Sequence, residues 1–207
     1  MLRRQTLQPA GETDIGWTTG LLALTYGASP IAEWAMSATG VRDTLATFYL
    51  GPIVEYALGR GEVDVVGDHT VAVWTPSAQP LPPEQMDRFG RIWGSRALER
   101  LPLLHDILAA RRPPGHDYLA LIAVSVSRRG RGIGSSLLAH HHARLDRRTR
   151  TAYLEAPPDS TRFYQRAGYT ATGAPVQLPG PGPVLQPMAR PPLPTTTSTT
   201  ARVESSR

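Results

Sequence analysis

The chain has 207 residues, of which 41% are hydrophobic, with a formal net charge of +5 and no cysteine. This length and apolar content predict one domain with a core of its own. The absence of cysteine excludes disulfide scaffolds, thiolate nucleophiles and cysteine metal sites, and it is typical of the reducing cytoplasm. All 22 residues of the Lys+Arg total are arginine, which excludes Schiff-base lysines and the P-loop. No run approaches the ~20 apolar residues that span a bilayer, so we expect a soluble, cytoplasmic protein without membrane contact.

Periodicity and turn residues predict the elements of the first half. We expect a strand at 3–7, helices at 13–23 and 42–58, and a hairpin of strands at 62–68 and 69–76 joined at Gly67 and Asp68. A proline-rich segment then leads into a long helical pattern over 83–110. Pro102 is expected to split that helix, because it removes a backbone donor from the helix interior.

The second half is predicted to alternate strands and helices. The apolar run at 118–126 indicates a buried central strand, followed by a glycine-rich turn and a helix after Gly132. A strand at 151–156, a helix at 159–168 and a strand at 169–176 complete a domain that spans 1–190. Residues 191–207 are rich in proline, threonine and serine and are expected to form a disordered tail.

The turn at 127–136, with the sequence SRRGRGIGSS, concentrates arginine and glycine. From 126 to 150 there are seven arginines and one acidic residue, Asp146, so this segment carries a charge of 7 − 1 = +6. A glycine-rich turn before a helix presents backbone N–H groups without internal partners at the positive end of the helix dipole. Phosphate is the ligand that suits this arrangement, and Arg129 and Arg131 can add charge-assisted hydrogen bonds.

Several ligand classes compete for this turn. A Walker loop is excluded because it requires lysine. The dinucleotide fingerprint G-x-G-x-x-G is matched by Gly132 and Gly134, but Leu137 takes the place of the third glycine, and too little chain follows for a doubly wound sheet. A nucleic-acid face would interleave aromatic residues with the arginines, and 126–150 contains none, so we expect no nucleic-acid partner.

Two motifs carry a resemblance to a known family. The run RGRGIG at 129–134 and the downstream segment YLEAPPDSTRFYQRAGY at 153–169 resemble the GCN5-related N-acetyltransferases (GNAT) in residue type, order and spacing. Within that family the likeness is nearest to puromycin N-acetyltransferase and its relatives among antibiotic-modifying enzymes, and it covers about 34–191. The sequence departs from the family pattern at Val126, where proline is common, and at Ser160, where asparagine is common.

The resemblance implies an α/β fold with one mixed, mostly antiparallel sheet flanked by helices, whose two central strands splay apart to hold acetyl-CoA without a metal. It also implies which residues contact acetyl-CoA. These are Ile122, Ala123 and Val124 along the pantetheine arm and thioester, and Arg129, Gly130, Arg131, Gly132, Ile133, Gly134, Ser135 and Ser160 around the phosphates and beyond.

The resemblance also places an acid and suggests a base. Tyr164 stands where the family keeps the acid that protonates the leaving thiolate, and the alternative is a tyrosine that only packs in the core. Glu155 is the candidate base, with a structural carboxylate as an equal alternative; Asp117, His116 and Glu55 are in reserve. The triplet at His140, His141 and His142 does not predict a metal site, because consecutive helical residues point about 100° apart.

The acceptor is expected to be a primary amine of a small molecule. The segments expected to wall its cleft carry aromatic residues and acids that suit a cationic, partly aromatic compound such as an antibiotic. These residues are Trp34, Phe48, Tyr49, Tyr56, Phe89 and Trp93, with Glu33, Glu55 and Glu62. The alternatives are a protein or peptide amine and a non-catalytic acyl-CoA-binding protein, and the chain is expected to be a monomer or homodimer.

Overall fold

The computed structural model describes residues 6–36, 45–76, 91 and 94–194. The strands are β1 (Leu7–Pro9), β2 (Glu62–Val66), β3 (Thr70–Thr75), β4 (His116–Val124), β5 (Thr151–Ala156), β6 (Thr170–Ala171), β7 (Val176–Gln177) and β8 (Val184–Arg190). The helices are α1 (Ile15–Tyr26), α2 (Pro30–Ala35), α4 (Gly51–Arg60), α6 (Ser95–Ala109), α7 (Ile133–Arg147) and α8 (Thr161–Arg166). A π-helical turn, η2 (Ala46–Leu50), runs into α4, and short 3-10 turns lie at Glu12–Asp14, Val126–Arg128 and Pro158–Ser160.

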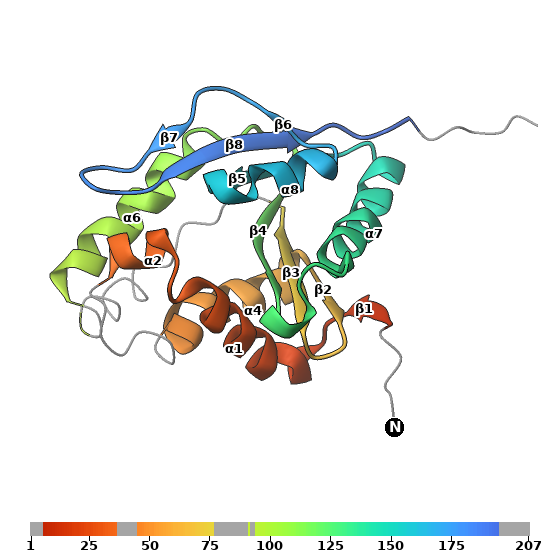
Figure 1. Cartoon of the computed structure of the whole chain (residues 1–207), viewed down its shortest axis with the longest axis horizontal. Helices are drawn as coiled ribbons and strands as arrows, with labels where there is room; N and C mark the ends of the chain where they lie inside the picture. The colour runs from red at the N-terminus through yellow and green to blue at the C-terminus, as the bar shows by residue number, and fades with distance from the viewer. Residues whose placement is uncertain (1–5, 37–44, 77–90, 92–93, 195–207) are drawn as a thin grey trace, which may run out of the picture.

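One sheet organises the fold, with the strand order β1-β2-β3-β4-β5-β8-β6 and β7 paired to β8. Every neighbouring pair is antiparallel except β4 and β5, which run parallel. Helices cover both faces: α7 packs on β2 to β5, while α1 and α4 pack on the opposite side (Figure 1). This architecture confirms the mixed, mostly antiparallel sheet flanked by helices.

The single parallel contact is short. His116, Asp117 and Tyr118 of β4 pair with Thr151, Ala152 and Tyr153 of β5, and the two strands pair no further. Beyond that point β4 stays with β3 as far as Val124, whereas β5 stays with β8 as far as Ala156. The two central strands therefore splay apart, as expected.

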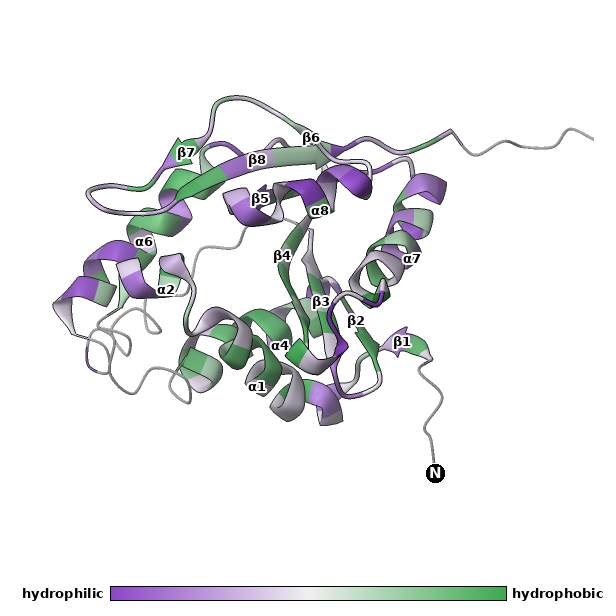
Figure 2. Cartoon of the chain, viewed as in Figure 1, coloured by the Kyte–Doolittle hydropathy of each residue, from purple (hydrophilic) through white to green (hydrophobic). Residues whose placement is uncertain are grey.

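Two hydrophobic cores lie on the two faces of the sheet. Val63, Val65, Val71 and Val73 of the hairpin face the core that α1, α2, α4 and α6 close. Ala72 and Trp74 face the second core, which Leu137, Leu138 and Leu145 of α7 complete. Figure 2 shows α7 hydrophobic on one side and hydrophilic on the other. The predicted stripe of Gly134, Leu138, His141 and Leu145 is buried throughout, which confirms it.

The hairpin was predicted correctly, since Gly67 takes a left-handed φ of 57° and β2 and β3 pair from Glu62–Trp74 to Val66–Thr70. The strand expected at 169–176 is instead two short strands, β6 and β7, which pair with different parts of β8. The first strand lies at Leu7–Pro9, later than expected, and residues 3–5 lie outside the described residues, as do 42–44, 83–90, 92–93 and 195–207 of other predicted segments.

Pro102 does not split its helix, so that prediction was wrong. The helix α6 continues from Ser95 to Ala109 with Pro102 inside it. A proline removes one hydrogen bond from the helix interior, but Ala97, Leu101 and Leu104 bury a stripe that continues past it. Packing of that stripe therefore outweighs the lost bond. Among the described helices, none combines the length and hydropathy that a membrane crossing requires.

The buried His142 should make stability depend on pH. Its Nε2 lies 3.0 Å from the Tyr169 hydroxyl. Burial, reinforced by Arg190 and His141 and opposed by Asp146, lowers the pKa of His142 from 6.5 to about 3. The unfolded chain therefore binds this proton at a higher pH than the native protein, so the contribution of neutral His142 is complete above pH ~6.5 and is lost as pH falls toward 3.

We expect His142→Gln to flatten the dependence of the melting temperature on pH between 6.5 and 4, measured by circular dichroism. His140→Gln is the matched control, because His140 lies on the same helix and its side chain is exposed. Some slope should persist in both variants, since burial also lowers the pKa of His105 to about 4. Parallel curves for the wild type and His142→Gln would contradict this account.

Candidate functional site

A cavity of about 1060 Å³ lies where β4 and β5 separate. Its wall includes the glycine-rich turn, the ends of α1 and α7, and parts of α2, α6, α8 and β8. Of the predicted site residues, Ile122, Val124, Arg129, Gly130, Gly132, Ile133, Gly134, Ser135, Glu155, Ser160 and Tyr164 line it. Ala123 and Arg131 do not: Ala123 is buried in the core on the α1 side, and Arg131 is exposed.

The glycine-rich turn lines one end of the cavity and leads directly into α7. Gly132 is the N-cap of α7 with a left-handed φ of 76°, and no side chain caps this helix end. A Cβ at Gly132 would meet no atom within 4 Å, so this position faces open space. A Cβ at Gly134 would lie 3.4 Å from Phe163 Cζ and from Val124 Cγ2, so α7 packs closely on α8 and β4 here. The arrangement leaves a helix N-terminus directed at the cavity.

Arginine side chains supplement the positive helix end. Arg129 Nε donates to the Val124 carbonyl at 3.0 Å, which ties the turn to the end of β4. Arg128 and Arg166 also line the cavity. Together these groups make one end of the cavity suitable for an anion such as a pyrophosphate.

Tyr26, which the sequence analysis did not identify, lies in the splay. Its hydroxyl accepts a hydrogen bond from the Ile122 N–H at 3.0 Å and donates to the Ile122 carbonyl at 3.1 Å. Burial raises the pKa of Tyr26, and the bond to Ile122 only partly opposes that rise. The hydroxyl therefore stays protonated and satisfies backbone groups that β5 no longer reaches.

Tyr164 lines the cavity, as an acid would, and also packs in the core, which was the alternative that the sequence left open. The residue is only 8% exposed and its ring packs edge-on against Phe163 and Tyr169, with centroids 5.0 and 5.8 Å away. Burial, with a smaller effect of the nearby Tyr26, raises the pKa of Tyr164 far above its usual 10.0. Its hydroxyl therefore carries a proton at any ordinary pH.

Glu155 is held by a buried ion pair. Arg112 donates to both of its carboxylate oxygens, at 3.1 and 3.2 Å, and the Tyr118 hydroxyl donates to Oε2 at 2.8 Å. The side chains of Arg112 and Glu155 are 7% and 2% exposed, and the Arg112 guanidinium lies 3.6 Å from the centroid of the Tyr118 ring. The charge of Glu155 is therefore already compensated. Arg112, Tyr118 and Glu155 thus connect the segment before β4 with β4 and β5, at the point where the two strands begin to separate.

The reserve candidates lie elsewhere. Asp117 pairs with Arg150, Glu55 is exposed on α4, and His116 is buried with a pKa lowered by that burial. None of the three is among the described residues that line the cavity.

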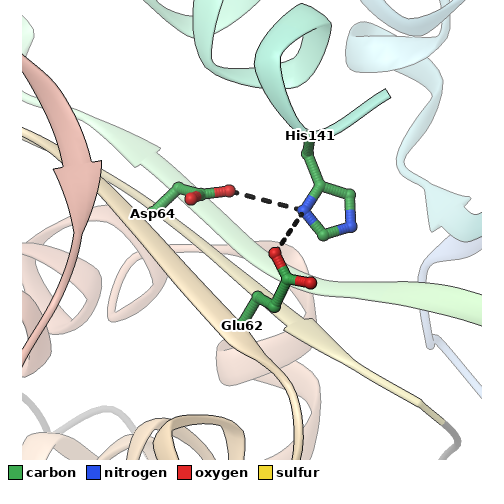
Figure 3. A group of neighbouring side chains, drawn as sticks. All are labelled: Glu62, Asp64 and His141. Carbon is green, nitrogen blue, oxygen red and sulfur yellow. Dashed lines mark ion pairs between the residues drawn. The ribbon is translucent and has the colours of Figure 1, made fainter. Parts of the chain in front are cut away.

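A separate cluster joins Glu62, Asp64 and His141 behind the sheet. His141 Nδ1 lies 3.4 Å from Asp64 and 3.7 Å from Glu62 (Figure 3). Three such groups resemble a metal site, but Arg144 donates a hydrogen bond to Asp64 and forms an ion pair with Glu62, and its guanidinium lies 2.8 Å from His141 Nδ1. The cationic partner of this cluster is thus a guanidinium, and we assign the cluster to the structure of the fold.

The same cluster explains much of the basic segment. Arg144 and Arg148 pair with acids of β2, and Arg150 pairs with Asp117 of β4. Burial raises the pKa of Asp64, but hydrogen bonds from His141 and Arg144 outweigh it and lower that pKa overall. The C-terminal part of the basic segment therefore anchors α7 to the sheet and does not form a free cationic face.

The second end of the cavity has an apolar wall. Among its lining residues are Ile31, Met36, Leu45, Leu50, Leu101 and Leu104. The aromatic residues expected there are placed differently: Tyr49 lines the cavity with its hydroxyl 3.2 Å from His105 Nε2, whereas Trp34 is buried and donates to the Pro179 carbonyl. Phe89 and Trp93 lie outside the described residues.

The expected acids are also elsewhere. Glu33 and Glu55 are exposed, and Glu62 belongs to the cluster behind the sheet. Within the described part of the chain, the carboxylates that line the cavity are Glu155 and Asp159.

The buried pair makes a stability prediction. Glu155→Gln should lower the free energy of unfolding by about 3–5 kcal/mol, because it leaves the guanidinium of Arg112 buried without a counter-charge. The double variant Arg112→Met with Glu155→Gln should recover part of that loss, since it removes the orphaned charge. Urea unfolding of the wild type, the single variants Glu155→Gln and Arg112→Met, and the double variant measures the coupling, and additive losses would contradict it.

Comparison with known proteins agrees with this site. Residues 104–171, which contain β4, the turn, α7, β5 and α8, match the family model described as the acetyltransferase (GNAT) domain. A structure from Corynebacterium glutamicum described as "histone acetyltransferase HPA2 and related acetyltransferase" is 27% identical, with a TM-score of 0.67 over 92% of this chain and 98% of that one.

Two further structures share the fold at lower identity. A mosquito protein described as "arylalkylamine N-Acetyltransferase like 5b" is 13% identical with a TM-score of 0.59, over 90% of this chain and 99% of its own. An N-acetyltransferase from Staphylococcus aureus Mu50 is 14% identical with a TM-score of 0.59, over 89% and 99%. These two structures show the shared fold, whereas the match of residues 104–171 and the Corynebacterium glutamicum structure support an acetyl-transferring enzyme of the GNAT type.

Proposed function

We propose that this enzyme transfers the acetyl group of acetyl-CoA to a primary amine of a small molecule. The observation that carries the proposal is the continuity of one cavity, which joins an anion-binding helix end, two buried tyrosines and an apolar chamber. The sequence resemblance to antibiotic-modifying enzymes suggests an amine-bearing antibiotic, acetylated in the cytoplasm for detoxification or self-resistance.

The turn and the strand edge would hold acetyl-CoA. The N–H groups at the start of α7, with Arg129, suit the pyrophosphate, and the edge of β4 beyond its short pairing with β5 suits the amide groups of the pantetheine arm. When bound, acetyl-CoA supplies the thioester that is the acyl donor. Ser160 lines the cavity and completes the proposed contacts.

Tyr164 would supply the proton that the leaving sulfur needs. The amine attacks the thioester carbon, the carbon–sulfur bond breaks, and the departing thiolate takes the hydroxyl proton. Because burial holds the pKa of Tyr164 well above the pKa of about 8.5 of a free thiol, the proton is expected to pass to the sulfur only in concert with carbon–sulfur cleavage, in a site where the departing thiolate is desolvated as well. Glu155 lines the cavity and could accept a proton, but protonation would uncouple Arg112, which favours its structural role.

The acceptor chamber favours an amine on an uncharged, apolar body. Its described wall is mostly aliphatic. Of the two carboxylates that line the cavity, Glu155 is already paired with Arg112, and Asp159 belongs to the turn before α8. A compound with several ammonium groups would have to bury charges against apolar side chains, which is costly. The described lining thus supports an aromatic or aliphatic amine over a polycation.

Binding of acetyl-CoA should depend on Gly132. At about 100 times its Kd, a ligand that binds only the native state stabilises it by about 2.7 kcal/mol. Gly132→Ala places a methyl group in the open space of the turn and should remove most of the shift in melting temperature. Gly115→Ala is the matched control, because Gly115 has a φ of 72°, no neighbour within 4 Å of an added Cβ, and no part in the cavity wall.

Both substitutions should lower the melting temperature of the unliganded protein, since a left-handed alanine costs about 1–2 kcal/mol. Equal acetyl-CoA shifts in the two variants would contradict the assignment of the turn. A shift with NADH and none with acetyl-CoA would overturn the proposed co-substrate.

The acceptor class is tested by thiol release from acetyl-CoA against a panel of amines. We expect turnover with arylalkylamines and aminonucleosides, and little with polyamines, aminoglycosides or peptides. Tyr164→Phe should reduce kcat by about 10²–10⁴-fold while acetyl-CoA still shifts the melting temperature. Turnover with peptides alone would replace the small-molecule acceptor by a protein or peptide, and an unchanged kcat would return Tyr164 to a packing role.

A further inference from the structure

The hydroxyl of Tyr26 occupies the position on β4 where a thioester oxygen is expected to bind. Because β5 diverges after Tyr153, the N–H and carbonyl of Ile122 have no partner on that side from a strand. Both groups bond instead to Tyr26, at 3.0 and 3.1 Å. The backbone N–H that would otherwise polarise the thioester is therefore already engaged.

Tyr26 is held firmly in this place. It is the last residue of α1, and Leu22 and Ala23 of the preceding turn are buried in the core. Its ring packs on the same core, and the residue lines the cavity shared with Tyr164. A carbonyl oxygen that arrives at this edge of β4 would have to displace a packed side chain to reach the Ile122 N–H.

A smaller movement is available. A tyrosine hydroxyl has one proton and two lone pairs, and here one lone pair accepts the Ile122 N–H. Rotation of the O–H about the C–O bond can turn the proton from the Ile122 carbonyl toward an incoming oxygen. The hydrogen bond from the Ile122 N–H to the hydroxyl oxygen is kept. The N–H bond polarises the hydroxyl and makes it a better donor. The released carbonyl can accept an amide N–H of the ligand, so each backbone group stays paired.

From this geometry we propose that Tyr26 is a catalytic residue whose hydroxyl donates the hydrogen bond to the thioester oxygen of acetyl-CoA. This inference rests on the proposed use of acetyl-CoA. As the amine nitrogen bonds to the carbonyl carbon, the π-electron pair moves onto oxygen, and Tyr26 stabilises that charge while it keeps its proton. The carbonyl then re-forms, the carbon–sulfur bond breaks, and the thiolate takes a proton from Tyr164. The nitrogen loses its proton to solvent and Tyr164 regains a proton from solvent, giving an amide and CoA.

The division of roles follows from placement. Tyr26 bonds to the strand edge from α1, whereas Tyr164 belongs to α8 on the other side of the splay. One hydroxyl is thus placed for the carbonyl oxygen and the other for the sulfur. A role in folding alone would not require Tyr26 to line the cavity.

The test reads the carbonyl directly. Acetyl-CoA labelled with carbon-13 at the thioester carbonyl is bound to the wild type, and its stretching band is recorded by infrared difference spectroscopy. We expect a lower frequency than for free acetyl-CoA, and in Tyr26→Phe a return most of the way to the free value. The control Tyr56→Phe, which changes a half-buried tyrosine of α4 outside the cavity wall, should keep the wild-type band.

Kinetics give a second readout. Loss of one donor to a developing oxyanion typically reduces kcat by about 10²–10³-fold, so Tyr26→Phe should lower kcat far more than it changes KM for acetyl-CoA. A wild-type band at the free frequency, a band that Tyr26→Phe leaves in place, or an unchanged kcat would each overturn the inference. Failure of the wild type to bind acetyl-CoA would overturn the proposed function as well. Binding with no effect of Tyr26→Phe would overturn only the role of Tyr26, so the two failures are distinguishable.

Discussion

Backbone hydrogen bonding at the divergence of β4 and β5 controls the rest of this structure. Buried N–H and carbonyl groups need partners, and a sheet that opens in its middle deprives one strand of them. In this protein the groups of Ile122 are satisfied by Tyr26, and the Val124 carbonyl by Arg129. The same opening provides the space in which a ligand with amide groups can take the place of a strand. The active cavity thus follows from an interrupted sheet, and the side chains around it keep the interruption stable.

Charge is used on the two faces of the sheet for different purposes. On one side of the splay, Arg112 and Glu155 form a buried pair just beyond Tyr118 and Tyr153, the last residues through which β4 and β5 pair. Behind the sheet, Arg144 satisfies two acids of β2. Buried pairs of this kind add little to net stability but lose much when one partner is removed, so they specify geometry. The positive charge of the turn, in contrast, stays available for a ligand.

The sequence predicted local features well. Gly132 before an apolar stripe predicted the turn and α7, and Gly67 with alternating valines predicted the hairpin. Each of these signals lies within a few residues of the structure it determines. The strand β8 was missed because Pro187 and the preceding proline–glycine run resemble a loop, although its pairing with β5 and β6 stabilises it. Pro102 was misjudged for a related reason, since tertiary packing decided the helix.

The parts of the site that could not be predicted depend on contacts between distant segments. Tyr26 and Ile122 are 96 residues apart, and Arg112 and Glu155 are 43 apart. Tyr26 ends an ordinary helix and Arg112 follows a second helix. Nothing in the sequence near either residue indicates its distant partner. The positions of Glu33, Glu55 and Trp34 away from the cavity show the converse: residue type suggested an acceptor site, and the fold directed those side chains elsewhere.

The helix α7 connects the two charged regions. It has 15 residues and is therefore about 22 Å long. Its first turn faces the cavity, and its last turns are fixed to β2 by Arg144 and Arg148. A stiff rod held at one end transmits a change of angle there as a displacement at the other. Glu62 and Asp64 thus help to fix the direction of the helix dipole. Substitutions at these two distant positions would therefore alter the affinity for the phosphate groups of the ligand.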